Sequence, residues 1–173
     1  MITTRALRIK AEQSDADSQF RLGFRLAFNR NRAMRDMDEA FIWWRRAAKQ
    51  HHVRAIFFLA TCYDFGKGCK ANASKAMELY RAAAALGHET AQYNLGISLR
   101  DGMNVRRDLK AAVELLRKSA RQGYAPAQND LGVMYFEGEG VKRSPATARA
   151  WYTKAAAQGY AMSRRNLAKM EHR

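Results

Sequence analysis

The feature that most constrains this chain is a set of residue columns that return every 36 positions. With one step of 37 between its first two members, a leucine column runs through Leu22, Leu59, Leu95, Leu131 and Leu167. The position after each leucine is always small: Gly23, Ala60, Gly96, Gly132 and Ala168. A bulky column keeps the same phase at Trp44, Tyr80, Leu116 and Tyr152. Repeats of this length indicate a solenoid or another stacked array rather than a single irregular core.

Each copy contains two helical patterns, and the clearest copy spans 125–160. Leu131 and Tyr135 lie four residues apart on one helical face before a Gly-Glu-Gly turn interrupts the pattern. Ser144 before Pro145 is typical of a helix start, and Gly159 stands where a left-handed residue ends a helix. The small column allows two helices to approach closely while the bulky column fills the space between them.

This pattern resembles the Sel-one-like repeat, which is related to the tetratricopeptide repeat. The resemblance rests on Ala-x-Ala-x-x-x-Leu-Gly-x-x-Tyr-x-x-Gly-x-Gly-Val at 125–141 and Trp-Tyr-x-Lys-Ala-Ala-x-Gln-Gly at 151–159. It is also specific at 89–124, looser at 53–88, where Cys69 replaces the valine, and loosest at 16–52, where His51 replaces the glycine. The resemblance implies a right-handed superhelix that binds other proteins.

We therefore predict an all-α, right-handed α-solenoid of helix-turn-helix repeats that occupies 1–173 as a single repeat domain. It comprises an N-terminal half-repeat helix at 3–13, repeats at 16–52, 53–88, 89–124 and 125–160, and a capping helix at 161–173. The first helices are expected at about 15–28, 53–65, 89–101, 125–137 and 161–171. The second helices are expected at about 37–50, 73–86, 108–122 and 144–158. The core is expected to contain Leu22, Leu59, Leu95 and Leu131.

Residues that could carry chemistry do not form a recognisable set. We expect no catalytic residues, no metal site and no cofactor, because no metal-ligand spacing and no nucleophile–base pattern occurs. His51 and His52 are adjacent and are interpreted as helix-end residues whose partly positive imidazoles suit the helix dipole. Cys62 is interpreted as a small buried apolar residue and Cys69 as a substitute for the loop valine. Whether these two cysteines pair is left open.

One face of the first helices is the predicted partner-binding surface. In tetratricopeptide-like solenoids the first helix of each pair lines the concave side. The residues predicted to lie there are Phe20, Phe24, Phe28, Phe57, Thr61, Phe65, Tyr93, Ile97, Asp101, Asn129 and Val133. The same spacing continues through Glu137, Arg165, Lys169 and Arg173. An exposed apolar patch usually marks a binding surface. The alternative is that these aromatic residues pack on the neighbouring repeat or form a self-association surface.

The charge balance supports a second hypothesis. The net charge is +15, from 31 basic and 16 acidic residues, and this favours attraction to polyanions or acidic proteins. No stretch approaches the roughly 20 apolar residues of a membrane span, and the first residues lack the apolar region of a signal peptide. A cytoplasmic location is therefore expected. The favoured function is a non-catalytic adaptor that binds a protein or peptide segment; the alternative is a binder of nucleic acid or an anionic membrane through a basic outer surface.

Overall fold

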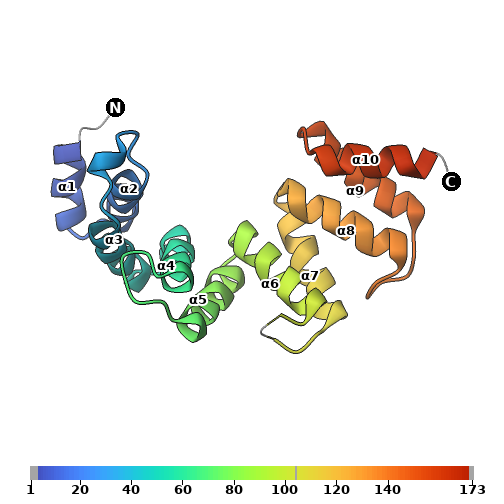
Figure 1. Ribbon diagram of the computed structural model, residues 1–173, viewed down its shortest axis with the longest axis horizontal. Helices are drawn as coiled ribbons and strands as arrows, with labels where there is room; N and C mark the ends of the chain where they lie inside the picture. Colours follow the sequence, from blue (N-terminus) through green and yellow to red (C-terminus); the bar gives the residue numbers. More distant parts are fainter. Residues whose placement is uncertain (1–3, 104, 172–173) are drawn as a thin grey trace. The chain divides into compact units, whose positions relative to one another are not determined.

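The computed structural model describes residues 4–103 and 105–171, and within these ranges it contains helices and turns but no strand (Figure 1). The helices in chain order are α1 (Thr4–Glu12), α2 (Ala16–Ala27), η1 (Arg32–Met34, a 3-10 turn), α3 (Met37–Lys49), α4 (Val53–Phe65), α5 (Ala73–Ala85), α6 (Glu89–Asp101), α7 (Leu109–Arg121), α8 (Ala125–Glu137), α9 (Pro145–Ala157) and α10 (Ala161–Glu171).

The helices lie where the repeat pattern predicts them, with ends that differ by one residue at most. Local capping explains this agreement. A side-chain oxygen directly before the helix accepts a hydrogen bond from the backbone N–H three residues later at Asp15, Asp36, Asn72, Asp108 and Ser144. The predicted helix start at Ser144 and Pro145 is confirmed, and Gly138 ends α8 in the left-handed region with a φ of 81°. Of the predicted terminal helices, residues 3, 172 and 173 lie outside the described residues.

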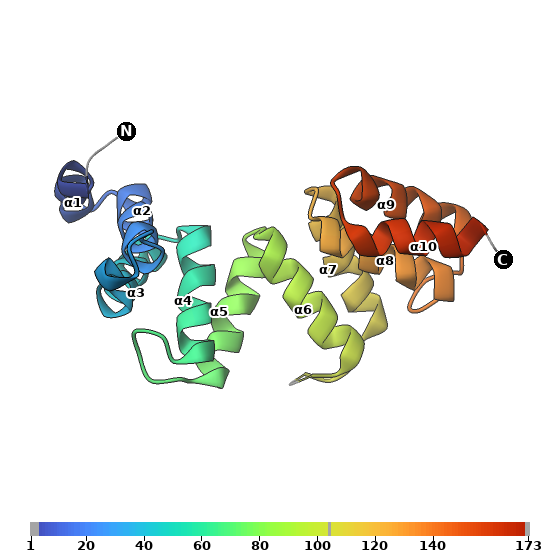
Figure 2. The same ribbon diagram turned by 45° about the horizontal axis from the view of Figure 1, so that its top comes forward.

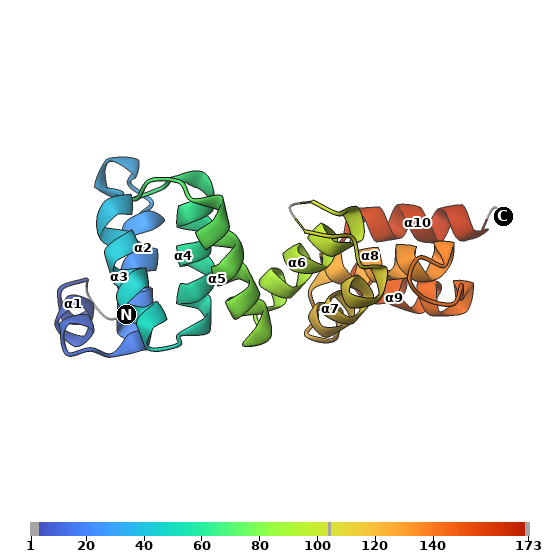
Figure 3. The same cartoon turned by 90° about the horizontal axis from the view of Figure 1, so that it is seen from below.

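The chain divides into two compact units, Met1–Leu86 and Gly87–Arg173. In the first unit, each of the helices α1 to α5 packs against the next one in the chain (Figures 1 and 3). In the second unit, α6 to α10 follow the same rule, and Figure 2 shows α10 lying across α8 and α9. Each unit therefore buries its apolar faces between helices that are neighbours in sequence.

The core of the first unit is centred on Trp44, which is 1% exposed. Its indole N–H donates to the carbonyl oxygen of Phe20 at 3.3 Å, which links α3 to α2. Cys62 is buried in the same core and Cys69 packs against it, so both predicted roles are confirmed. Both cysteines are free thiols, and burial raises the pKa of Cys62 to about 12, so that this thiol stays protonated near neutral pH.

The core of the second unit is built from Leu116, Leu131 and Met134, all fully buried. The predicted core leucines Leu22 and Leu59 of the first unit are buried as well. Leu95 of α6 is only half-buried, which differs from the expectation that it is a core residue.

The glycine positions of the small column have to stay small because each one lies directly against a bulky side chain of the next helix. A Cβ atom added to Gly132 would lie 2.6 Å from Cε1 of Tyr152, and one added to Gly23 would lie 2.7 Å from Nε1 of Trp44. At Gly96 the nearest atom would be Cγ of Leu116 at 3.0 Å. The first and second helices of these repeats therefore pack with a side chain of one against the backbone of the other.

We predict that Gly132→Ala destabilises the protein whereas Gly96→Ala does not. Overpacking against a rigid aromatic ring costs about 1–3 kcal/mol, which exceeds the roughly 1 kcal/mol that alanine gains over glycine within a helix. At Gly96 the flexible side chain of Leu116 can move away by the few tenths of an ångström that the added Cβ atom requires. Chemical denaturation should show a lower midpoint for Gly132→Ala; an equal or higher midpoint than that of Gly96→Ala would contradict this explanation.

His51 occupies a backbone conformation that the other repeats assign to glycine. Its φ is 59°, and the equivalent glycines Gly87, Gly123 and Gly159 have φ values of 93°, 93° and 88°. His52 lies at a helix end as expected: it directly precedes α4, and its Nδ1 accepts a hydrogen bond from the Ala55 backbone N–H at 3.2 Å.

We predict that His51→Gly stabilises the protein by about 1 kcal/mol, because a residue with a Cβ atom pays about that much in the left-handed region. His51 is exposed, so the removal of its side chain leaves no cavity. His51→Ala is the control, since alanine loses the imidazole but keeps the strained conformation. Thermal unfolding should show a higher Tm for the glycine variant only, and a rise of equal size in both variants would assign the effect to the imidazole.

Candidate functional site

Three phenylalanines of the first unit form an aromatic surface, here defined as Phe24 of α2, Phe28 directly after the end of α2, and Phe58 of α4. The ring centroids of Phe24 and Phe28 are 4.7 Å apart, and each lies within 6 Å of the Phe58 ring, at 5.7 and 5.9 Å. Phe24 is 40% exposed and Phe28 is 52% exposed. Aromatic area left in water is unfavourable by roughly 25 cal/mol per Å², so this surface is suited to being covered.

The aromatic surface is held in place by the core beneath it. Phe58 lies 4.9 Å from the Trp44 ring, and Phe28 lies 6.4 Å from the same ring. Trp44 is itself positioned by the Gly23 contact and by its hydrogen bond to Phe20. The rings are therefore backed by a buried and rigid side chain, which limits the side-chain entropy that a partner would have to remove on binding.

Phe20 was expected to be accessible on this face, and this expectation is wrong. Its side chain is 3% exposed because the His52 ring stacks on it at 4.8 Å and the Arg54 guanidinium lies 4.7 Å from its centroid. His52 is the last residue of the same repeat, whereas Arg54 belongs to the following one. The alternative interpretation, packing on the neighbouring repeat, is the one that fits this residue.

The three remaining positions of the first unit differ from one another. Phe57 is half-buried and lies 5.8 Å from Tyr80 of α5, so it packs within its own repeat. Thr61 is half-buried, and its hydroxyl donates to the Phe58 carbonyl oxygen at 2.7 Å. Phe65 is 67% exposed at the end of α4, with the ammonium of Lys67 5.5 Å from its ring. Of these three, Phe65 alone presents most of its side chain to solvent.

Sequence reasoning missed Phe58, although a signal was present. The equivalent positions of the other repeats hold Arg21, Asn94 and Asp130, all polar. A phenylalanine that replaces a polar residue on a first helix departs from the repeat, and here it bridges the rings of α2 to the core. A search for apolar departures from the repeat, rather than for a fixed helical face, would have found it.

We predict that Phe58→Ala lowers the free energy of unfolding by about 2–3 kcal/mol, because it removes a half-buried ring that packs on the core. Phe65→Ala is the matched control on the same helix and should change stability by no more than about 0.5 kcal/mol, since its ring is mostly in water. Urea denaturation of both variants measures this difference. Equal losses would show that Phe58 does not support the aromatic surface.

In the second unit, most of the predicted positions already have partners inside the protein. The Tyr93 hydroxyl donates to Asp130 at 3.0 Å, and burial raises the pKa of this tyrosine above its ordinary value. Ile97 packs against the core, and Asp101 pairs with Arg100 at 2.7 Å. These contacts stabilise the unit and leave Tyr93 and Ile97 half-buried, whereas Asp101 is exposed.

Asn129 is a second correction, because it is buried rather than facing a groove. Its Oδ1 accepts hydrogen bonds from Ser163 at 2.9 Å and from Asn166 at 3.1 Å, and its amide donates to Asp130 at 2.9 Å. Ser163 and Asn166 belong to α10, so the last helix covers this residue. Asn129 thus joins α8 to α10 through a satisfied polar network.

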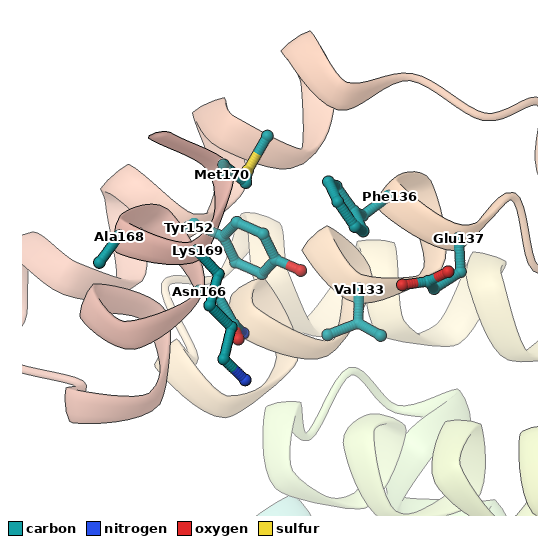
Figure 4. Close-up of a pocket in the computed structure, with 8 residues that line it drawn as sticks. All are labelled: Val133, Phe136, Glu137, Tyr152, Asn166, Ala168, Lys169 and Met170. Atoms are coloured by element: carbon teal, nitrogen blue, oxygen red, sulfur yellow. The ribbon is translucent and has the colours of Figure 1, made fainter. Parts of the chain in front are cut away.

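Val133 remains accessible and lies on a cleft between α8, α9 and α10 of the second unit (Figure 4). The cleft has a volume of about 560 Å³, which lies within the range of ligand pockets. Its lining consists of Val133, Phe136, Glu137, Tyr152, Asn166, Ala168, Lys169 and Met170. The predicted series had included Glu137 and Lys169, but not Phe136, Tyr152 or Met170; Arg173, its last member, lies outside the described residues.

The basic residues of the second helices are partly engaged with aromatic rings. The guanidinium of Arg46 lies 4.6 Å from the Trp43 ring, and the ammonium of Lys154 lies 4.5 Å from the Trp151 ring. Trp43 is 4% exposed, so its face is closed to a nucleic-acid base. The part of the chain that the structure describes holds no cluster of three or more metal-ligand side chains. Over the same ranges, no helix has the length and apolar content that a membrane span requires.

Repeated pairs of helices, packed small residue against bulky residue, define this protein as an α-solenoid repeat protein. The family model of the Sel1 repeat matches four segments, 16–52, 53–88, 90–124 and 125–160. The chain therefore belongs to the Sel1 repeat family. Proteins of this family generally serve as scaffolds for protein–protein interactions.

Solved structures agree with this assignment. A protective antigen present in uropathogenic Escherichia coli strains, which displays an SLR fold, shares 36% identity over 98% of this chain with a TM-score of 0.87. A Sel1 repeat protein from Oxalobacter formigenes shares 31% identity over 96% of the chain with a TM-score of 0.90. An immunity protein from Pseudomonas aeruginosa shares 26% identity over 89% of the chain and 56% of its own, with a TM-score of 0.61.

The chain corresponds to only part of the first two of these relatives. It covers 36% of the Escherichia coli protein and 48% of the Oxalobacter formigenes protein. Among proteins with curated descriptions, none matches this sequence. The comparisons thus identify the family and the repeat.

Proposed function

We propose that this protein is a non-catalytic adaptor that binds an apolar segment of a partner protein on the aromatic surface of its first unit. The observation that carries the proposal is the exposure of Phe24 and Phe28, two rings in contact with each other and backed by Phe58. Aromatic residues that are rigid and partly exposed are frequent anchors of protein interfaces. The general role of Sel1 repeats as interaction scaffolds supports the same function.

The helical location of the aromatic surface favours a segment that lies along α2 and α4. Phe24 and Phe28 are one helical turn apart, which suits two apolar side chains with a similar spacing on the partner. Phe65 lies two turns beyond Phe58 on α4, on the same side of that helix, and extends the proposed binding face. Phe20 does not contribute to this binding face because its side chain is buried.

The test is a selection of peptides from a random library displayed on phage, followed by titration of the selected peptides. We expect enrichment of leucine and aromatic residues, and an affinity loss of about tenfold or more when Phe24 and Phe28 are both replaced by alanine. Ile42→Ala is the matched control: Ile42 is 40% exposed like Phe24 but lies on α3. Unchanged affinity in a folded double variant, or equal loss with Ile42→Ala, would contradict the proposal.

A salt titration of the same complexes separates this function from the alternative, binding of nucleic acid or an anionic membrane. The net charge of +15 favours that alternative, and such binding falls steeply with rising salt. Apolar anchoring predicts a shallow dependence. Sedimentation of the protein alone tests the self-association hypothesis, in which the double variant would shift the protein from a dimer to a monomer.

A further inference from the structure

The cleft of the second unit contains a tyrosine hydroxyl group that has no hydrogen-bond partner among the described residues. Tyr152 is 3% exposed, yet its phenol group makes no hydrogen bond to any described residue. Nor is its oxygen sealed inside the protein, because the described residues include no fully buried side-chain N or O atom without a partner. Figure 4 shows the hydroxyl of Tyr152 pointing toward Val133 and Phe136, across the cleft. The group is therefore buried on all sides except the one that opens on the cleft.

The equivalent tyrosine of the first unit has the hydrogen-bond acceptor that Tyr152 lacks. Tyr80 stands 72 positions earlier in the same column, and its hydroxyl donates to Asp64 at 3.2 Å. The residue equivalent to Asp64 in the second unit is Phe136, which has no acceptor. Because a polar group with so little exposure is normally hydrogen-bonded, the change from aspartate to phenylalanine leaves a hydrogen-bonding position that a ligand in the cleft can use.

The walls around this hydroxyl are apolar and adaptable. Val133 and Phe136 of α8 face Met170 of α10, and all three are half-buried. Methionine side chains adjust their shape to different ligands and interact favourably with aromatic rings. With a volume of about 560 Å³, the cleft has room for one large side chain and the adjoining peptide backbone.

Two exposed groups of opposite charge stand at the mouth, Glu137 at the end of α8 and Lys169 on α10. Neither is ion-paired with another residue in the described part of the chain. A polyanion such as nucleic acid would bring phosphates against Glu137, whereas a peptide can carry charges of both signs. The arrangement therefore favours a ligand with an apolar centre and opposite charges on its two sides.

We propose that this cleft is a second binding site, for a peptide segment of a partner protein that inserts one leucine-sized apolar side chain between Val133, Phe136 and Met170. The peptide backbone next to that side chain forms a hydrogen bond with the Tyr152 hydroxyl. An acidic residue of the peptide lies toward Lys169, and a basic residue lies toward Glu137. The site belongs to the second unit and does not involve the aromatic surface of the first.

The first experiment uses two blocked tripeptides of the same composition, acetyl-Glu-Leu-Lys-amide and acetyl-Lys-Leu-Glu-amide, titrated into the protein and followed by NMR. The protein should prefer one order of charges by about fivefold, as expected for two exposed ion pairs. The double variant Glu137→Lys, Lys169→Glu should prefer the other order. Blocked tri-alanine, which lacks the apolar side chain and the charges, should show no binding.

The second experiment removes the hydroxyl alone. Tyr152→Phe keeps the ring that packs on Gly132 and should weaken binding of the preferred tripeptide about five- to tenfold. Tyr80→Phe is the matched control, since it removes the equivalent hydroxyl of the first unit and should leave tripeptide binding unchanged. The Tm of Tyr152→Phe should equal or exceed that of the unaltered protein, because no hydrogen bond within the protein is lost.

The proposal is overturned if neither tripeptide binds, if the charge-swapped variant keeps the original preference, or if Tyr152→Phe and Tyr80→Phe behave alike. Competition of the tripeptide with a short RNA at the Tyr152 resonances would overturn it as well, in favour of a polyanion site. The double variant Phe24→Ala, Phe28→Ala should bind the tripeptide normally. Failure of this second site and failure of the aromatic surface are thus separate results.

Discussion

The structure depends on the contact between a small residue on the first helix of a repeat and a bulky residue on the second. Where Gly132 meets Tyr152 and Gly23 meets Trp44, there is no space for one additional carbon atom. This contact sets the distance between the paired helices and orients the ring that lies over the glycine. The aromatic surface and the cleft both use such a ring: Trp44 supports Phe28 and Phe58, and Tyr152 directs its hydroxyl into the cleft.

The two candidate sites arise where a copy departs from the repeat. In the first unit, Phe58 replaces the polar residues of the other copies and joins Phe24 and Phe28 into one surface. In the second unit, Phe136 replaces the equivalent of Asp64 and leaves the tyrosine hydroxyl without its acceptor. The glycine–ring contacts that hold the paired helices together are retained at both places. The repeat therefore supplies the scaffold, and its exceptions supply the surfaces that can distinguish partners.

Much of the fold could be predicted because its determinants are local. Helix starts such as Ser144 depend on a hydrogen bond to the third residue that follows, and the periodicity of one helix reveals its apolar face. The site was predicted less well. Helical spacing places Phe20, Phe24 and Phe28 on one face, yet Phe20 is covered by His52 and Arg54 while the other two remain exposed. Asn129 is covered in the same way by α10, and Leu95 is only half-buried.

By itself, the sequence determined the repeat, the helix boundaries, the pairing of small and bulky columns, and the candidate surface on the first helices. Only the tertiary structure decided which members of that surface are accessible, because accessibility depends on side chains that lie more than 30 residues further along the chain. It also decided that Phe58 belongs to the aromatic surface and that Tyr152 opens on a cleft. The reason is physical: periodicity states which way a side chain leaves its helix, whereas burial and hydrogen-bond satisfaction depend on what the next helices place against it.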